Sequence, residues 1–218
     1  MESDNPFGAD NQQGSPSHPP CGRDVIPQRL NAELLAVGAK GLEAYLQGAL
    51  CDGTQSALHH THRFSQAHCG WLNVLNESLT ILGYRSWMYR EGLNRNLWVL
   101  ETTAPFLSKS FDARTLLFEP QGLDYVRGYF DSDGGMPSRL DARLYFQFCQ
   151  KNLESLGVVK SILEQRSIGC GRVHNPSKRA DPHYWRLYVL SHSHERFMRM
   201  VGSWHPKKRE QLEHRMKI

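Results

Sequence analysis

The sequence predicts an α+β protein made of two similar halves. Stretches with apolar residues at helical spacing alternate with short segments that are typical of strands. The order of these features in the first half of the chain recurs in the second half. Such self-similarity indicates an internal duplication.

The duplication is carried by residues of the same type in the same order. An acidic residue before a glycine recurs after 81 residues, a glutamine after 84 and a tryptophan after 87, so the spacing drifts only slightly. The matched pairs are Asp52 with Asp133, Gln66 with Gln150, and Trp98 with Trp185. Three matches in one order predict that the two halves share one fold.

Each half is expected to run helix, Asp-Gly turn, two strands, helix and further strands. A helix with a 3.6-residue apolar period follows each matched glutamine. In the second half the first strands are expected at 136–138 and 143–148, and a later hairpin pairs 171–174 with 184–190. Extra helices are predicted at 194–201 and 207–216, with Pro206 well suited to a helix start.

Composition divides the chain into four segments. Residues 1–26 are rich in Pro, Ser, Gly, Asn and Gln, so we expect a disordered tail there. The first half is predicted to span 27–104 and the second half 121–218. Residues 105–120 are expected to link the two halves.

Charge and cysteine content narrow the class of protein. Lys and Arg number 26 against 22 acidic residues, giving a net charge of +4 that permits a polyanionic partner. The five cysteines are odd in number and form no CxxC pair, so a disulfide framework is not expected. Neither a membrane span nor a secretion signal is apparent, and we expect an intracellular protein of undetermined compartment.

The second copy of the acidic motif suggests a metal site. A helix-like stretch ends in Asp131-Ser132-Asp133-Gly134-Gly135, which places Asp133 at a helix C-terminus. The negative end of the helix dipole disfavours an anion there, and a divalent cation would offset this. A calcium loop is excluded because Ala142 stands where a glutamate is needed. A plain helix end is the alternative, and the second copy of the motif argues against it.

The segment 125–134 closely resembles the signature of the LAGLIDADG homing endonucleases. The matching positions are Val126, Gly128, Phe130, Asp131, Asp133 and Gly134. The resemblance extends over about residues 38–218. Two motifs in one chain imply the single-chain, pseudo-twofold form of this family.

The first copy of the motif, residues 45–54, departs from the pattern. If the acids Asp52 and Asp133 are aligned, Gln47 stands opposite Gly128. If Gly48 is aligned with Gly128 instead, one residue is missing before Asp52. Both alignments are open at the level of sequence, and both retain the acid.

The resemblance implies a fold and a partner. The fold would consist of duplicated αββαββα units with saddle-shaped antiparallel sheets and the two motif helices side by side at the interface. Ala44, Gly48 and Gly128 would let these helices approach closely. The sheets would lie in the major groove of double-stranded DNA, where all four base pairs can be distinguished.

The resemblance also implies an active site. Asp52 and Asp133 would each hold Mg²⁺, with Mn²⁺ or Ca²⁺ as possible substitutes, assisted by the backbone carbonyls of Cys51 and Ser132. Gln66 and Gln150 match the position that orients water. Lys208 matches the basic residue near the scissile phosphate, Lys207 is an equal candidate, and Lys109 is the nearest option in the first half.

Polar residues in the expected strands and loops are the candidates for contacting DNA. They are Gln55, His59, His62, Arg90, Asn94, Arg95, Arg139, Arg143, Arg172, His174, Lys178 and Arg179. An individual arginine here is more often a phosphate contact or plain surface than a base reader. The spacing of the cluster His59, His60, His62, His68 and Cys69 fits no zinc module.

The function implied is a site-specific DNA endonuclease of the intron-homing type. It would act as a monomer on a long asymmetric target and cleave both strands across the minor groove, leaving 3′ overhangs. One alternative is an RNA-binding intron maturase or a catalytically inactive DNA-binding protein of the same fold, favoured by the irregular first motif. A second alternative is an α+β protein with no nucleic-acid role.

Overall fold

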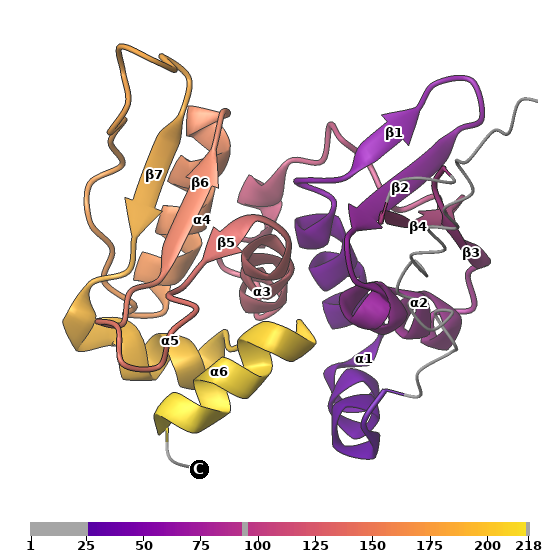
Figure 1. The fold of residues 1–218 in the computed structure, drawn as a ribbon, viewed down its shortest axis with the longest axis horizontal. Helices are drawn as coiled ribbons and strands as arrows, with labels where there is room; N and C mark the ends of the chain where they lie inside the picture. The colour runs from indigo at the N-terminus through magenta and orange to yellow at the C-terminus, as the bar shows by residue number, and fades with distance from the viewer. Residues whose placement is uncertain (1–25, 93–95, 217–218) are drawn as a thin grey trace, which may run out of the picture.

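The fold is built around two helices that pack against each other between two sheets (Figure 1). The computed structural model describes residues 26–92 and 96–216. The predicted tail and the candidate DNA contacts Asn94 and Arg95 lie outside the described residues, apart from Ile26.

The central helices are α1 (Gln28–Ala49) and α3 (Gly122–Asp133). α1 is kinked at Gly38, which has φ 76°, a backbone conformation that glycine adopts readily. The buried residues beyond the kink, from Gly41 to Ala49, form the part that packs on α3. The motif helix of the first half is therefore the second segment of α1.

The first half contains a four-stranded antiparallel sheet in the order β1-β2-β4-β3. Its strands are β1 (Thr54–Ser56), β2 (Thr61–Gln66), β3 (Ser86–Arg90) and β4 (Trp98–Thr102). Helix α2 (Cys69–Ile81) follows β2 and packs against β2 and β4. Phe64 and Leu100 are directly opposite each other, are buried, and join the core formed with α2.

The second half repeats this arrangement with a three-stranded sheet, β5-β6-β7. Its strands are β5 (Gly134–Gly135), β6 (Gln147–Gln150) and β7 (Trp185–Tyr188), and α4 (Leu153–Gln165) packs on β6 and β7. The remaining elements are η1 (Ala113–Leu116), η2 (Ser191–Ser193), α5 (His194–Met200) and α6 (Pro206–Met216). As expected, Pro206 begins α6.

The strand expected at 136–138 is wrong, because the first strand of the second half is Gly134–Gly135. Pro137 has no N–H to donate to a ladder, which explains why pairing stops before it. The hairpin strand expected at 171–174 is reduced to two isolated bridges, Cys170 with Val189 and His174 with Arg186.

The register confirms the duplication. Gln66 is the last residue of β2 and lies opposite Trp98, while Gln150 is the last residue of β6 and lies opposite Trp185. Each matched glutamine therefore sits at the same point of its sheet.

None of the helices among residues 26–92 and 96–216 is long and apolar enough to cross a bilayer. Cys51, Cys149 and Cys170 are free thiols, whereas Cys69 is disulfide-bonded.

Candidate active site between the motif helices

The contact between α1 and α3 is made by two glycines. A Cβ on Gly48 would lie 2.0 Å from the carbonyl oxygen of Tyr125, and a Cβ on Gly128 would lie 1.9 Å from that of Tyr45. These reciprocal approaches show that Gly48 is the counterpart of Gly128. The missing residue of the first motif therefore falls between Gly48 and Asp52.

This deletion makes the two helix ends unequal. α3 continues to Asp133, whereas α1 ends at Ala49, so Asp52 lies in the turn beyond the helix. Asp52 is exposed and Asp133 is half-buried. The residues that precede them touch, since Cys51 Sγ lies 3.0 Å from Ser132 Oγ. The two acids thus lie near each other where the motif helices end.

The two carboxylates repel each other. Burial, together with the charge of Asp52, raises the pKa of Asp133 to about 7, although Lys208 opposes this. Partial loss of hydration raises the pKa of Asp52, against the lowering effect of Lys109 and Lys208. Ionising both acids is therefore unfavourable unless a bound cation offsets their negative charges.

A lysine lies at the end of each motif helix. Lys208 Nζ donates to the carbonyl oxygens of Phe130, Asp131 (3.0 Å) and Gly134 (2.7 Å). Lys109 Nζ donates to those of Leu50 (2.9 Å) and Cys51 (3.2 Å). Lys109 is thus placed at the first helix end in the same way as Lys208 at the second.

Both amines are partly desolvated. Burial lowers the pKa of Lys208 to about 8, with Asp131 and Asp133 acting in the opposite direction. Burial also lowers the pKa of Lys109, and Cys51 and Asp52 oppose that effect. Lys207, the alternative candidate, is exposed. The geometry therefore brings Lys208 rather than Lys207 to the helix end.

The two glutamines complete the two sets. Gln150 Nε2 donates to Asp133 Oδ2 at 3.1 Å, which fixes the orientation of that carboxylate. Gln66 occupies the equivalent position at the end of β2 and is half-buried. The candidate residues therefore come in two similar groups, one at each motif helix.

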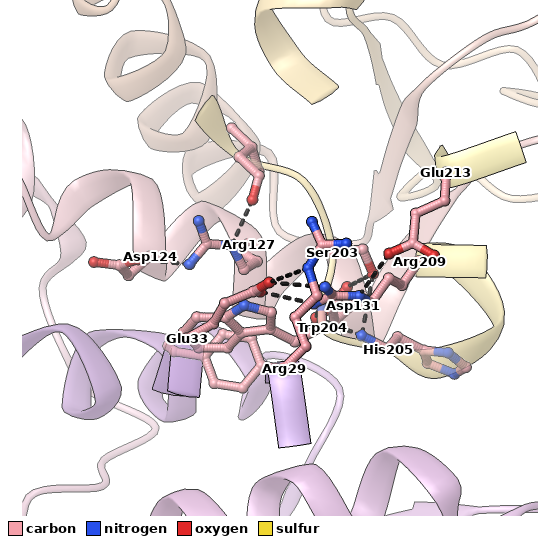
Figure 2. A network of polar contacts seen from close by, with 12 residues as sticks. Arg29, Glu33, Asp124, Arg127, Asp131, Ser203, Trp204, His205, Arg209 and Glu213 are labelled. Atoms are coloured by element: carbon pink, nitrogen blue, oxygen red, sulfur yellow. Dashed lines mark hydrogen bonds and ion pairs between the residues drawn. The ribbon is translucent and has the colours of Figure 1, made fainter. Parts of the chain in front are cut away.

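Asp131, the first acid of the second motif, has a different role. It is buried and accepts hydrogen bonds from Tyr45 Oη (2.9 Å), Trp204 N (2.9 Å) and His205 N (3.1 Å), and from the hydroxyl of Ser203. Figure 2 shows its carboxylate among these residues of the segment that leads into α6. All its lone pairs face protein donors, so Asp131 serves the structure rather than a cation.

The donor set fits a hard divalent cation. Carboxylate and carbonyl oxygens are the ligands that Mg²⁺, Mn²⁺ and Ca²⁺ take in proteins. Asp52 and Asp133 supply two carboxylates at adjacent helix ends, and their mutual repulsion is the feature a cation would remove. The backbone carbonyl of Cys51, which is expected to assist in binding the cation, already accepts a hydrogen bond from Lys109. Its oxygen would therefore have to serve both the lysine and the cation.

The raised pKa of Asp133 predicts how metal-free protein responds to pH. The folded state holds a proton on Asp133 up to about pH 7, whereas the unfolded state releases it near pH 4. Stability from this group therefore falls as pH rises from 4 to 7. We expect Asp133→Asn to match the wild type at pH 4 and to be about 2 kcal/mol more stable at pH 8, allowing for partial solvent exposure.

Urea unfolding in EDTA at both pH values measures this difference directly. Adding Mg²⁺ at pH 8 is expected to remove it, because the cation stabilises only the protein that keeps the carboxylate. A difference that is the same at pH 4 and pH 8 would show that Asp133 is not desolvated.

The residues expected to contact DNA are placed unequally. Eight are exposed: Gln55, His59, Arg90, Arg139, Arg143, Arg172, Lys178 and Arg179. Arg139 is ion-paired with Asp141, and His174 is half-buried and stacks on Tyr188. His62 is a correction. It is only 5% exposed, so it is not available to a ligand at the surface.

Alternation along the strands identifies surface residues that are not among the candidate DNA contacts predicted from the sequence. Because Phe64 and Leu100 point into the core, their neighbours Arg63 and Glu101 point to the other, open face of the sheet. Arg63 pairs there with Glu101 (2.8 Å) and Glu91 (2.6 Å), and Trp87 Nε1 donates to Glu101. The sequence already contains this signal. Phe64 is the apolar residue of its strand and marks the face that points into the core, so its neighbour Arg63 must lie on the other face.

The open face of the second half is different. Phe148 and Leu187 point into the core, which leaves Gln147, Arg186 and Tyr188 on the open side. The guanidinium of Arg186 lies 5.1 Å from the ring centre of Tyr184, and Tyr188 contacts both Tyr145 and His174. This face therefore presents aromatic rings and an arginine, whereas the face of the first half presents an arginine held by two acids.

Comparison with known proteins supports the fold. No family model and no curated protein matches the sequence. Solved structures do match. The homing endonuclease I-DmoI in complex with DNA and Mn is 15% identical with a TM-score of 0.55, over 76% of this chain and 98% of that chain.

Two structures of DUF199/WhiA also match. The full-length protein from Thermatoga maritima is 15% identical with a TM-score of 0.59, over 87% of this chain and 66% of that chain. The N-terminal LAGLIDADG domain of DUF199/WhiA is 17% identical with a TM-score of 0.58, over 80% and 90% of the two chains. At such identities the likeness concerns the fold. The chain thus has the fold of the LAGLIDADG homing endonucleases, in the single-chain form that carries both motifs in one polypeptide.

Proposed function

We propose that the protein is a metal-dependent, site-specific endonuclease of double-stranded DNA. The observation that carries the proposal is the pairing of Asp52 and Asp133 at adjacent helix ends, each end also holding a lysine. Such an arrangement has two similar centres, which suits two strands. I-DmoI, which shares the fold, has been solved with DNA and Mn, with target DNA and Mg, and with DNA and Ca.

The residues of the chain have distinct tasks in this proposal. Asp52 and Asp133 would bind the cations, and a bound cation would activate water and stabilise phosphate oxygens. Gln150 donates to the carboxylate of Asp133 and would orient the attacking water. Lys109 and Lys208 would supply positive charge where negative charge develops on the scissile phosphates.

The open faces of the two sheets would contact the duplex. Their side chains differ between the halves, which predicts an asymmetric target read by one monomer. Arg186 suits guanine or phosphate, whereas Glu101 suits the amino group of cytosine. Exposed basic residues outside the sheets, such as Lys178 and Arg179, would contact phosphates.

The ion pair on the first open face predicts a gain in binding. Glu101→Gln removes a negative charge and leaves Arg63 paired with Glu91 alone, while the amide oxygen still accepts from Trp87. We expect about tenfold tighter binding to duplex at low salt, with a steeper salt dependence. Fluorescence anisotropy measures both. Glu195→Gln, which removes an exposed carboxylate on α5, is the control, and equal affinities for the two variants would contradict the prediction.

Cleavage of a random duplex library tests the proposed function. Wild-type protein is incubated with the library in Mg²⁺ or in EDTA, and the ends produced are sequenced on both strands. The proposal expects Mg²⁺-dependent cuts at one long asymmetric site, with 3′ overhangs. Binding of duplex without any cut in Mg²⁺ or Mn²⁺ would refute it.

A non-cleaving DNA-binding protein is the second candidate. The shortened first motif favours it, because Asp52 lies outside the helix and is exposed, unlike Asp133. The library experiment separates the two functions, because this candidate enriches a bound sequence without cutting it. Preferential binding of structured RNA would favour the intron maturase instead.

A further inference from the structure

Two short segments deliver the lysines to the helix ends, and we call them straps. The first strap, residues 104–109, follows β4 and ends at Lys109. The second strap, residues 203–208, follows α5 and ends at Lys208. Each lysine then contacts carbonyls at the end of the motif helix in its own half. The straps have no residue motif in common apart from the lysine.

The first strap is fastened by Gln47 of α1. Its side chain is 8% exposed, its Nε2 donates to the carbonyl oxygen of Ser108 at 2.7 Å, and its Oε1 accepts from Ser108 N at 3.0 Å. Both bonds go to the backbone of the residue next to Lys109. Buried His62 adds a hydrogen bond with the backbone of Leu107.

The second strap is fastened by Asp131 of α3. Its carboxylate accepts from the backbone N–H groups of Trp204 and His205, just before Pro206 begins α6. A carboxylate at this end of a helix is favourable because the helix dipole is positive there. Arg209, one residue beyond Lys208, pairs with Glu33 of α1 at 2.7 and 2.8 Å and holds α6 in place.

Gln47 and Asp131 hold the two straps in the same way but differ in chemistry. Each is a buried polar side chain on a motif helix that bonds to the backbone one to four residues before the lysine. One is a neutral amide and the other a carboxylate. The surroundings also differ, because a cavity of about 470 Å³ lies beside Ser108 and Lys109, whereas Tyr45 and Trp204 pack beside Asp131.

We propose that Gln47 and Asp131 are positioning residues that separately set the two lysines for cleavage of the two strands. The inference rests on the proposed nuclease function. Loosening a strap moves its lysine away from one helix end only, because the two fastenings share no strap residue. Displacements of about 1 Å at a catalytic group reduce rates by as much as 100-fold. Each substitution should therefore slow one strand and spare the other.

The test uses the full chain, a cleavable duplex labelled on both strands, and Gln47→Met, which keeps the length of the side chain but loses both hydrogen bonds. We expect cleavage of one strand to fall at least tenfold and that of the other to change less than twofold. Asp131→Asn should show the opposite strand preference. Gln121→Met is the control, since Gln121 makes no side-chain cap hydrogen bond at the start of α3.

Asp131→Asn is a change in a buried network, so two milder variants accompany it. Tyr45→Phe and Ser203→Ala each remove one hydrogen bond to Asp131 and should show the same strand preference to a smaller extent. Thermal unfolding of each variant identifies simple loss of fold. Equal slowing of both strands by a folded Gln47→Met, or no change in either, would overturn the proposal.

A readout without cleavage separates this inference from the proposed function. NMR of protein with ¹³C-labelled lysine follows the titration of each amine. Gln47→Met should return the pKa of Lys109 towards its ordinary value and leave that of Lys208 unchanged. Tyr45→Phe and Ser203→Ala, which keep the charge of Asp131, should shift the pKa of Lys208 and leave that of Lys109 unchanged. If the wild type cuts no duplex, the nuclease proposal fails. If neither lysine responds to its own fastening, the strap inference fails independently.

Discussion

Gly128→Ala is expected to destabilise the protein by about 3 kcal/mol or more. The new Cβ would lie 1.9 Å from the carbonyl oxygen of Tyr45, and that oxygen belongs to the backbone of the partner helix. It cannot turn aside as a side chain can, so α1 and α3 must separate. Because the acids lie at the ends of these helices, we expect cleavage to fall as well.

Gly157→Ala is the matched control for this prediction. Gly157 also lies inside a helix, α4, but nothing lies within 4 Å of its Cβ position. Alanine favours a helix over glycine by about 1 kcal/mol, so this variant should be slightly more stable. Urea unfolding of the two variants measures the difference. Equal stabilities would show that α1 and α3 do not pack through these glycines, and Gly48→Ala should behave like Gly128→Ala.

Asp133→Asn is expected to reduce double-strand cleavage by about 10³-fold or more. The amide keeps the size of the side chain and one oxygen but loses the charge that holds a cation. Binding of duplex should persist or become tighter, because one negative charge facing phosphates is removed. Gel-based cleavage rates in Mg²⁺, together with affinities in Ca²⁺, separate these effects.

Glu195→Gln is the control for the loss of a carboxylate. Glu195 is exposed and its ion pair, among residues 26–92 and 96–216, is with Arg199 on α5, so both cleavage and binding should stay close to wild type. If Asp133→Asn cuts both strands at the wild-type rate, the acids do not form the active site. If it fails to bind duplex, the loss of cleavage reports on recognition instead.

The sequence was sufficient to predict the parts of the site that depend on local pattern. The helix that ends in Asp133-Gly134 follows from a helical run stopped by glycines, and Asp52 follows from the duplication. The alignment around Gly48 stayed open, because the spacing from glycine to acid is one residue shorter in the first motif, and spacing alone does not show whether the glycines or the acids correspond. The contacts with Tyr125 and Tyr45 decide it.

Long-range contacts were beyond the sequence pattern. Asp131 belongs to the motif, yet its hydrogen bonds reach residues more than 70 positions away, and nothing local indicates them. The candidate His62 was misplaced for another reason. It shares the face of β2 with Phe64, so strand alternation turns it inward, while Arg63 faces outward.

The central claim is that Asp52 and Asp133 together hold the cations that cut DNA. The most direct measurement is anomalous diffraction from crystals of the protein with its selected duplex and Mn²⁺. The claim predicts manganese peaks in contact with a carboxylate oxygen of Asp133 and one of Asp52, next to the scissile phosphates. An ordered duplex across the motif helices, with no manganese at either carboxylate, would contradict it.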